Sequence, residues 1–379
     1  MRDWPASLGE FLRRRQDLVR LTQVAVLALY LLLMLGPVFI GPGNPLAERL
    51  SAAALTLFWS LWWPGVILSM MLVGQVWCGL LCPDGTVTEA VSRHGRGLKP
   101  QAWMRREWLP LALFAVVTFA SDAADAHATH RGTLLAVGTI SLAALVMGLF
   151  YGRGRRIWCR YLCPAAGIFS LLSRCAVLHF KVDRTAWDTA AKPVPKPVEC
   201  PLLLDVRRLV SNEKCNMCSR CHGHRDAVRL TFRWPGSEIL SMTDAEVRLW
   251  EALGICFILL GLGSAGARAH GDGLAIIRLA LALGGLSAGG LWLAALGNVR
   301  EAARLSYGLI PFAGMSLFAA ILPPGVGRGI VQFIPLAGIL WSGGLGWRMT
   351  QAWPQNRRWL ARCVGTALLL GLLSIILSI

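Results

Sequence analysis

Hydrophobic positions along this chain gather in long unbroken runs, separated by short polar or basic segments. A helix needs roughly 20 apolar residues to cross a bilayer, and about nine runs approach that length. Two are weak, because the third ends early at Ser121-Asp122 and the seventh is interrupted by Pro311. The pattern predicts an all-α polytopic membrane protein with about nine transmembrane helices. The runs are 21–40, 50–77, 108–121, 133–151, 249–267, 274–296, 307–322, 330–347 and 360–379.

Charge indicates how these spans are oriented. Only 16% of the residues are charged, whereas a soluble domain carries about 25%. The net charge is +17, and 17 of the 38 Lys and Arg residues lie in the polar stretch 152–248. If the spans alternate, most of the others fall on the same face, which is the positive-inside pattern. We therefore expect a bacterial-type inner (cytoplasmic) membrane, with the N-terminus and the cysteine motifs on the cytoplasmic side and the C-terminus outside. The excess of basic residues then reflects the topology of the chain and its contact with membrane lipid. This interpretation argues against nucleic-acid binding.

The polar stretch divides the chain into three segments. Residues 1–151 are expected to form a four-helix membrane unit, and residues 152–248 a small cytoplasmic insert. Residues 249–379 are expected to form a five-helix membrane unit, to which the sequence assigns no role. Within the insert, prolines alternate with other residues at 192–197, a pattern typical of an extended spacer.

A cysteine motif occurs twice, as Trp77-Cys78-x-x-Leu81-Cys82-Pro83 and as Trp158-Cys159-x-x-Leu162-Cys163-Pro164. Such self-similarity indicates an internal duplication. Proline is favoured at the first position of a helix, so each motif should begin a new helix, at 83–93 and 164–174. The N-terminus of a helix carries free N–H groups and partial positive charge, which should lower the pKa of the thiols.

Two facing copies would place four thiolates around one point at the cytoplasmic membrane surface. Four thiolates are the ligand set of a [4Fe–4S] cluster, and a structural zinc site or two unrelated thiol pairs are the alternatives. The expected ligands of this first cluster are Cys78, Cys82, Cys159 and Cys163.

A second cysteine group, Cys215-x-x-Cys218-x-x-Cys221, has the spacing of a bacterial ferredoxin run. The run lacks its usual fourth cysteine, because Arg225 occupies that position. Cys200, which is followed by proline, is the expected replacement, and Cys175 is the alternative. A zinc site that adds His222 or His224 to the three cysteines is also open. The expected ligands of this second [4Fe–4S] cluster are Cys200, Cys215, Cys218 and Cys221.

Histidine and carboxylate residues gather once, on the predicted outer face. Such residues can bind copper or zinc, although a solvated polar loop is the other interpretation. No histidine lies in the middle of a predicted span, so we expect no haem. The candidate ligands of this outer site are Asp122, Asp125, His127 and His130.

At its cysteine motifs the chain resembles the membrane-bound 4Fe–4S polyferredoxin family typified by NapH, MauN, NosR and CcoG. The resemblance covers roughly residues 20–235 and includes both Cys-x-x-x-Cys-Pro motifs and part of the ferredoxin run. It implies electron transfer between the quinone pool and a redox partner, or electron supply for metal reduction or cofactor maturation. Family members commonly carry two complete ferredoxin runs, whereas this chain has one incomplete run and five additional C-terminal spans.

These patterns lead to one main functional hypothesis. The chain would be a quinol-linked electron-transfer subunit with two [4Fe–4S] clusters, which relays electrons to a redox partner and has no catalytic side chain of its own. An electron donor for copper reduction or metalloenzyme maturation is a second hypothesis, motivated by the outer Asp/His loop. A zinc-bearing membrane scaffold or sensor without redox activity is a third.

Overall fold

The computed structural model of the chain describes residues 4–190, 198–266, 272–323 and 325–378. Within these residues most elements are helical, and two short strands form an antiparallel pair. Seven described helical segments are long and apolar enough to cross a membrane, and two shorter apolar helices, Leu109–Ala123 and Ile310–Ala320, match the two weakest runs. The prediction of an all-α polytopic membrane protein is therefore confirmed. The proline tract at 192–197 lies outside the described residues.

The N-terminal helices, which we define as the elements of residues 4–151, place the first cysteine motif at the end of a bent membrane crossing. This crossing begins where the side chain of Asn44 accepts the N–H of Leu46 and Pro45 takes the first helical position. It ends at Gly74, whose φ of 79° suits glycine. A π-helical segment, η1, joins its two α-helical parts. The elements are α1 (Trp4–Arg14), α2 (Gln16–Ile40), α3 (Pro45–Leu55), η1 (Thr56–Trp62), α4 (Trp63–Val73), α5 (Val76–Leu80), α6 (Pro83–Ser92), α7 (Leu109–Ala123) and α8 (His130–Tyr151).

The polar insert, residues 152–248, carries the second motif and then the strand pair. Leu178 pairs with Phe232 and Val182 with Val228, so the cysteines of the ferredoxin run lie in the long connection between the two strands. The elements are α9 (Ile157–Tyr161), α10 (Pro164–Leu172), η2 (Ser173–Cys175), β1 (Leu178–Val182), α11 (Arg184–Thr189), η3 (Val206–Arg208), η4 (His224–Asp226), β2 (Val228–Phe232) and α12 (Ser237–Ser241).

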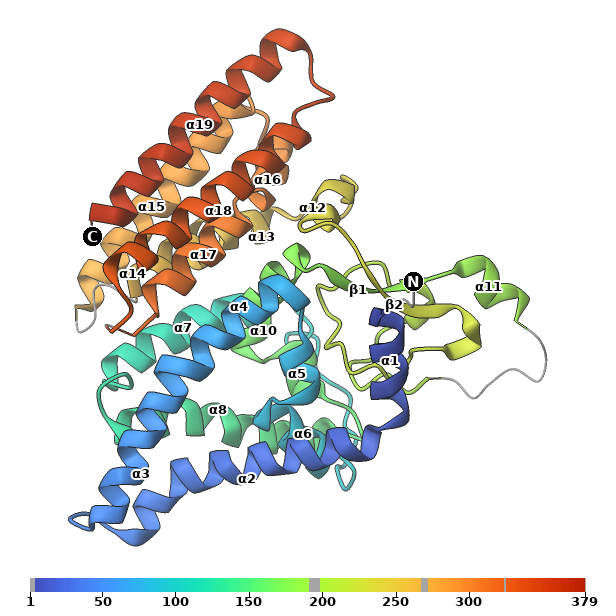
Figure 1. Cartoon of the computed structure of the whole chain (residues 1–379), viewed down its shortest axis with the longest axis vertical. Helices are drawn as coiled ribbons and strands as arrows, with labels where there is room; N and C mark the ends of the chain where they lie inside the picture. Colours follow the sequence, from blue (N-terminus) through green and yellow to red (C-terminus); the bar gives the residue numbers. More distant parts are fainter. Residues whose placement is uncertain (1–3, 191–197, 267–271, 324, 379) are drawn as a thin grey trace.

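The C-terminal helices, residues 249–378, contain a second π-helical segment, η5, and pack side by side (Figure 1). Their glycine-rich faces allow close approach, as where Gly338 lies against the backbone of Phe312. The elements are α13 (Leu249–Leu253), η5 (Gly254–Leu262), α14 (Gly263–Gly266), α15 (Gly273–Ala294), α16 (Val299–Tyr307), α17 (Ile310–Ala320), α18 (Arg328–Met349) and α19 (Gln355–Ser378).

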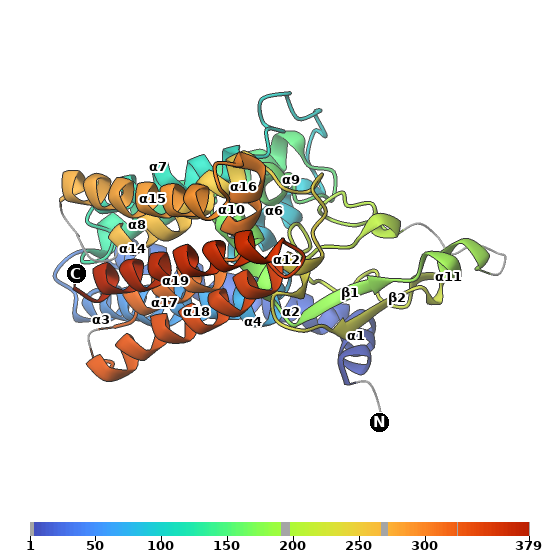
Figure 2. The same ribbon diagram turned by 90° about the horizontal axis from the view of Figure 1, so that it is seen from above.

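The long helices form one block with the insert at one end of it. In Figure 2, α1, α11 and the strand pair lie at one end, and the end of α19 lies at the other. The described part of the chain therefore begins near the insert and ends at the opposite end of the block.

A buried ionic cluster joins the insert to the C-terminal helices. The guanidinium of Arg174 lies 3.0 Å from a carboxylate oxygen of Glu213, 3.2 Å from one of Glu251 and 3.8 Å from one of Glu238. The hydroxyl of Tyr307 donates a hydrogen bond to Glu251. Because removing one partner of a buried ion pair leaves an uncompensated charge, loss of Arg174 should destabilise the junction between the two segments.

Candidate metal centre

The two copies of the cysteine motif have the same local fold. In each, a short helix (α5 or α9) is followed by a leucine, and a second helix (α6 or α10) begins at the proline after the second cysteine. The backbone angles of Leu81 (φ −127°, ψ −13°) and Leu162 (φ −126°, ψ −13°) are nearly identical. In the first copy, the N–H of Gly85 donates to the sulfur of Cys82 at 3.4 Å. The predicted helix starts are therefore confirmed.

The four thiols of the two motifs come together on the wall of one cavity of about 710 Å³. Cys78 and Cys82 each lie within electrostatic reach of Cys159, and Cys163 lies within reach of both. The structure thus gathers the predicted first ligand set, and the donor chemistry of four thiols fits a [4Fe–4S] cluster.

The pKa of these thiols moves in the opposite direction to the prediction. Burial raises the pKa of Cys82 and of Cys159 to about 12. The N–H of Gly85 lowers the pKa of Cys82, as expected of a helix N-terminus, but the loss of solvation outweighs it. Metal ligation must therefore displace protons from these thiols.

The second cysteine set lines a small separate cavity of about 20 Å³, formed by Cys200, Cys215, Cys218 and Cys221 together with their neighbours. The loop between the cysteines turns through left-handed backbone at Met217 (φ 55°) and Ser219 (φ 60°). This backbone is uncommon for residues with a side chain and marks functional loops. It lets the N–H groups of Met217 and Arg220 donate to the sulfurs of Cys215 and Cys218.

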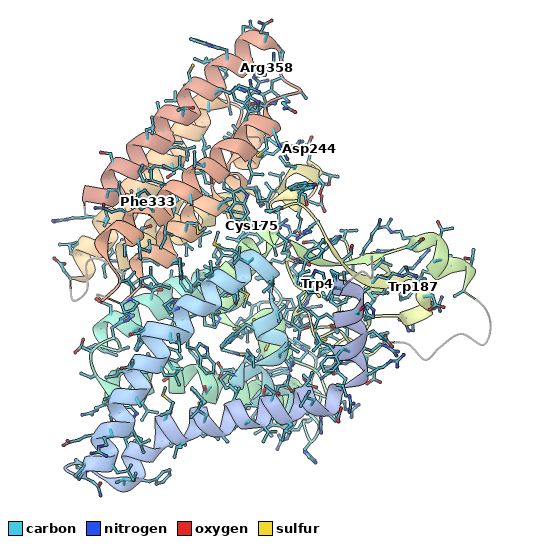
Figure 3. The ribbon with its side chains drawn as sticks, viewed as in Figure 1. Trp4, Cys175, Trp187, Asp244, Phe333 and Arg358 are labelled. Carbon is cyan, nitrogen blue, oxygen red and sulfur yellow. The ribbon has the colours of Figure 1, made fainter. Side chains whose placement is uncertain are left out.

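The alternative ligands of the second cluster lie outside this small cavity. Cys175, labelled in Figure 3, is buried in the main hydrophobic core near the junction with the C-terminal helices. His222 accepts the N–H of Leu230 through Nδ1, and His224 packs on the ring of Trp187. None of the three lines the small cavity.

The two cysteine sets meet at Gly79, inside the first motif. A Cβ atom at this position would lie 2.1 Å from the carbonyl oxygen of Asn216 and 3.1 Å from the backbone nitrogen of Cys218. Asn216 lines both cavities. Only glycine therefore allows the first motif to touch the ferredoxin run.

We expect Gly79→Ala to destabilise the protein by about 1–3 kcal/mol, because the added methyl overpacks this contact, and to lower the iron content of the purified chain. Thermal unfolding and iron analysis measure both effects. Gly65→Ala in α4 is the matched control, since nothing lies within 4 Å of its Cβ position. Wild-type iron content and melting temperature in Gly79→Ala would contradict the importance of this contact.

Arg156, which the sequence analysis missed, lies between the two sets. Its side chain is 1% exposed. Its Nε donates to Glu89 at 2.7 Å, and its Nη1 donates to the carbonyl oxygen of Cys78 at 2.7 Å. Its positive charge acts on Cys159 of the first set and Cys218 of the second. One sequence feature could have pointed to Arg156. The residue two positions before the tryptophan is Arg156 in the second motif and Gln75 in the first, so the two copies of the motif differ there.

The four residues of the predicted outer site lie at the end of α7, in the turn after it and at the start of α8. The ring of His127 packs on Trp59 with centroids 3.9 Å apart, and His130 hydrogen-bonds through Nε2 to the carbonyl oxygen of Leu33 at 3.0 Å. Among the described residues, no group of three or more His, Cys, Asp or Glu has the geometry to hold one metal ion. The cysteines of a [4Fe–4S] cluster differ from such a group, because each binds a separate iron. The outer metal site (Asp122, Asp125, His127, His130) therefore remains a prediction.

Comparisons with known proteins agree with the cysteine geometry. A family model described as a 4Fe–4S binding domain matches residues 55–106 and 133–185, one segment for each copy of the motif. YccM of Escherichia coli (strain K12), a protein named for electron transport, is 26% identical over 191 residues, which cover 41% of this chain and 50% of YccM. Regulatory protein NosR of Pseudomonas aeruginosa is 25% identical over 181 residues, which cover 42% of this chain and 25% of NosR.

The chain thus spans half or less of the length of these curated relatives. No solved structure matches it. The matched family segments indicate binding of a 4Fe–4S cluster and confirm the resemblance drawn from the motifs. They end before the ferredoxin run and before the C-terminal helices.

Proposed function

We propose that this chain, a relative of the membrane-bound 4Fe–4S electron-transport proteins through its duplicated motif, passes electrons between the quinone pool and a redox partner. Two [4Fe–4S] clusters, when bound, would supply the one-electron carriers that this transfer needs. Cys78, Cys82, Cys159 and Cys163 would hold the first cluster, and Cys200, Cys215, Cys218 and Cys221 the second.

One observation carries this proposal: the thiols of the duplicated motif line a large cavity bordered by membrane-crossing helices. Its volume of about 710 Å³ lies in the range of small-molecule sites, roughly 300–1,000 Å³. A lipid-soluble quinol could therefore reach the first cysteine set from within the bilayer.

Arg160 offers a polar partner for the ring oxygens of such a molecule. It follows Cys159 directly and lines the same cavity. Its Nη1 is buried and has no hydrogen-bond partner within the described residues. Buried donors are normally satisfied, so this group is suited to a ligand oxygen.

The second cysteine set supports a path out of the membrane. It lies in the polar insert, and the contact at Gly79 joins it to the first set. We place the insert on the cytoplasmic side of a bacterial-type inner membrane, on the strength of its basic residues, with a redox partner docking there. The division into units at 1–151, 152–248 and 249–379 is part of the same proposal.

An anaerobic titration tests this function. The full chain is purified without oxygen, its iron, sulfide, visible and EPR spectra are recorded, and a reduced quinone is added. We expect about eight irons per chain, four for each cluster, and bleaching of the visible absorption by the quinol. Eight irons without bleaching would exclude quinol as the donor and favour a soluble donor or the metal-reduction hypothesis. Zinc in place of iron would reject the redox function.

A further inference from the structure

A row of aromatic rings runs along the cavity from the first cysteine motif to its opposite end. Trp77 precedes Cys78 and packs on Trp62 with ring centroids 4.8 Å apart. Trp62 stacks on Phe58 at 6.5 Å, and Phe58 meets Trp59 at 4.9 Å. All four rings line the cavity.

Three of the four rings belong to the π-helical segment η1. The N–H of Trp63 bonds to the carbonyl oxygen of Phe58, five residues back, rather than four. A π-helical turn widens the helix and occurs frequently at functional sites. Here it places Phe58, Trp59 and Trp62 of one crossing on the wall of the cavity.

The far end of the cavity differs in chemistry from its apolar middle. Ser121 and Asp122, at the end of α7, and His127, in the turn after it, line this end. That helix has 15 residues, so the turn lies about 22 Å from the start of α7. The ring of His127 continues the aromatic row onto Trp59, whose Nε1 is held by the hydroxyl of Thr133 at 3.1 Å.

The C-terminal helices supply the opposite wall at this end. Ala320 and the following residues up to Pro323 line the cavity, as do Gly263 and Gly266 of α14. A Cβ atom at Gly266 would lie 3.2 Å from the side chain of Thr118 in α7. Residues 249–378, which lie outside the matched family segments, thus close a cavity that begins at the cysteines.

We propose that the far end of the cavity is a second binding site for a planar aromatic ring bearing oxygen substituents, the class of the quinone headgroup. The choice of class rests on the function proposed above. Trp59 lines the cavity and offers aromatic surface against which the ring can pack. Ser121 and His127 can donate hydrogen bonds to the ring oxygens, and Asp122 can accept one from a quinol hydroxyl. A lipid acyl chain is apolar and forms no hydrogen bonds with these polar groups.

Binding of a soluble probe, 2,3-dimethyl-1,4-naphthoquinone, tests this site. Equilibrium dialysis with the iron-loaded full chain should give two saturable sites in wild type. Trp59→Leu should lose one of them, and so should Ala320→Phe, which fills the far end from the C-terminal side. Trp234→Leu is the control, because Trp234 is 81% exposed and lies outside the cavity lining. If Trp59→Leu fails to fold, His127→Leu replaces it, since His127 lies in an exposed turn.

The possible results distinguish failure of the second binding site from failure of the proposed function. Suppose that wild type has one probe site, that Trp59→Leu leaves it unchanged and that quinol still bleaches the protein. This result overturns the second site alone. A phospholipid that co-purifies and that the probe does not displace also overturns it, because the far end then holds a lipid. No probe binding and no bleaching overturn both. Loss of one site in Trp59→Leu and in Ala320→Phe, with bleaching retained, supports the second site.

Discussion

Replacing Cys82 by serine is expected to lower the iron content from about eight to about four per chain, because one [4Fe–4S] cluster needs four thiolates. Reduction by quinol should be lost as well, since Cys82 lines the cavity that quinol would enter. Cys163→Ser should behave in the same way, because the two residues occupy equivalent positions at the starts of α6 and α10. Iron analysis and anaerobic quinol titration measure both effects.

Two further variants make this result specific. Cys363→Ser removes an exposed thiol outside both sets and should match wild type in iron and in reduction. Cys218→Ser should lose about four irons and keep the quinol-dependent bleaching of those that remain. Eight irons and wild-type reduction in both Cys82→Ser and Cys163→Ser would refute the first ligand set.

Replacing Arg156 by glutamine is expected to lower the reduction potential of both clusters. A cation stabilises the more negative, reduced form, and Arg156 is a buried cation that acts on thiols of both sets. Two unit charges about 8 Å apart interact by about 2 kcal/mol at an effective dielectric constant near 20. For a one-electron couple this corresponds to a decrease on the order of 90 mV. An EPR-monitored redox titration of the purified chain measures the shift.

The controls separate charge from packing. Arg156→Lys keeps the charge and should retain potentials near those of wild type. Arg155→Gln removes the adjacent exposed arginine and should change little, because exposed charges are screened by solvent. Glu89 keeps a second partner in Arg156→Gln, since Arg220 also donates to it, which limits the loss of stability. Unchanged potentials in Arg156→Gln would show that this charge does not tune the clusters.

Much of the architecture could be predicted because it depends on local pattern. Apolar runs of membrane length became helices, and the two weakest runs became the two shorter helices. The proline after each second cysteine marked a helix start, as seen at Pro83 and Pro164. The prediction of thiol pKa was wrong because the helix N-terminus is a local effect, whereas burial depends on how distant segments pack.

The sequence by itself determined the membrane class, the duplicated motif and the eight candidate cluster cysteines, because run length, spacing and proline position act within a few residues. Only the tertiary structure decided what lies between and around those cysteines. Arg156 and Gly79 matter through contacts with Glu89 and Asn216, which are distant in sequence. The cavity likewise has walls from α4, α7 and the C-terminal helices. No spacing along the chain encodes such contacts, since they arise only when helices far apart in sequence pack together.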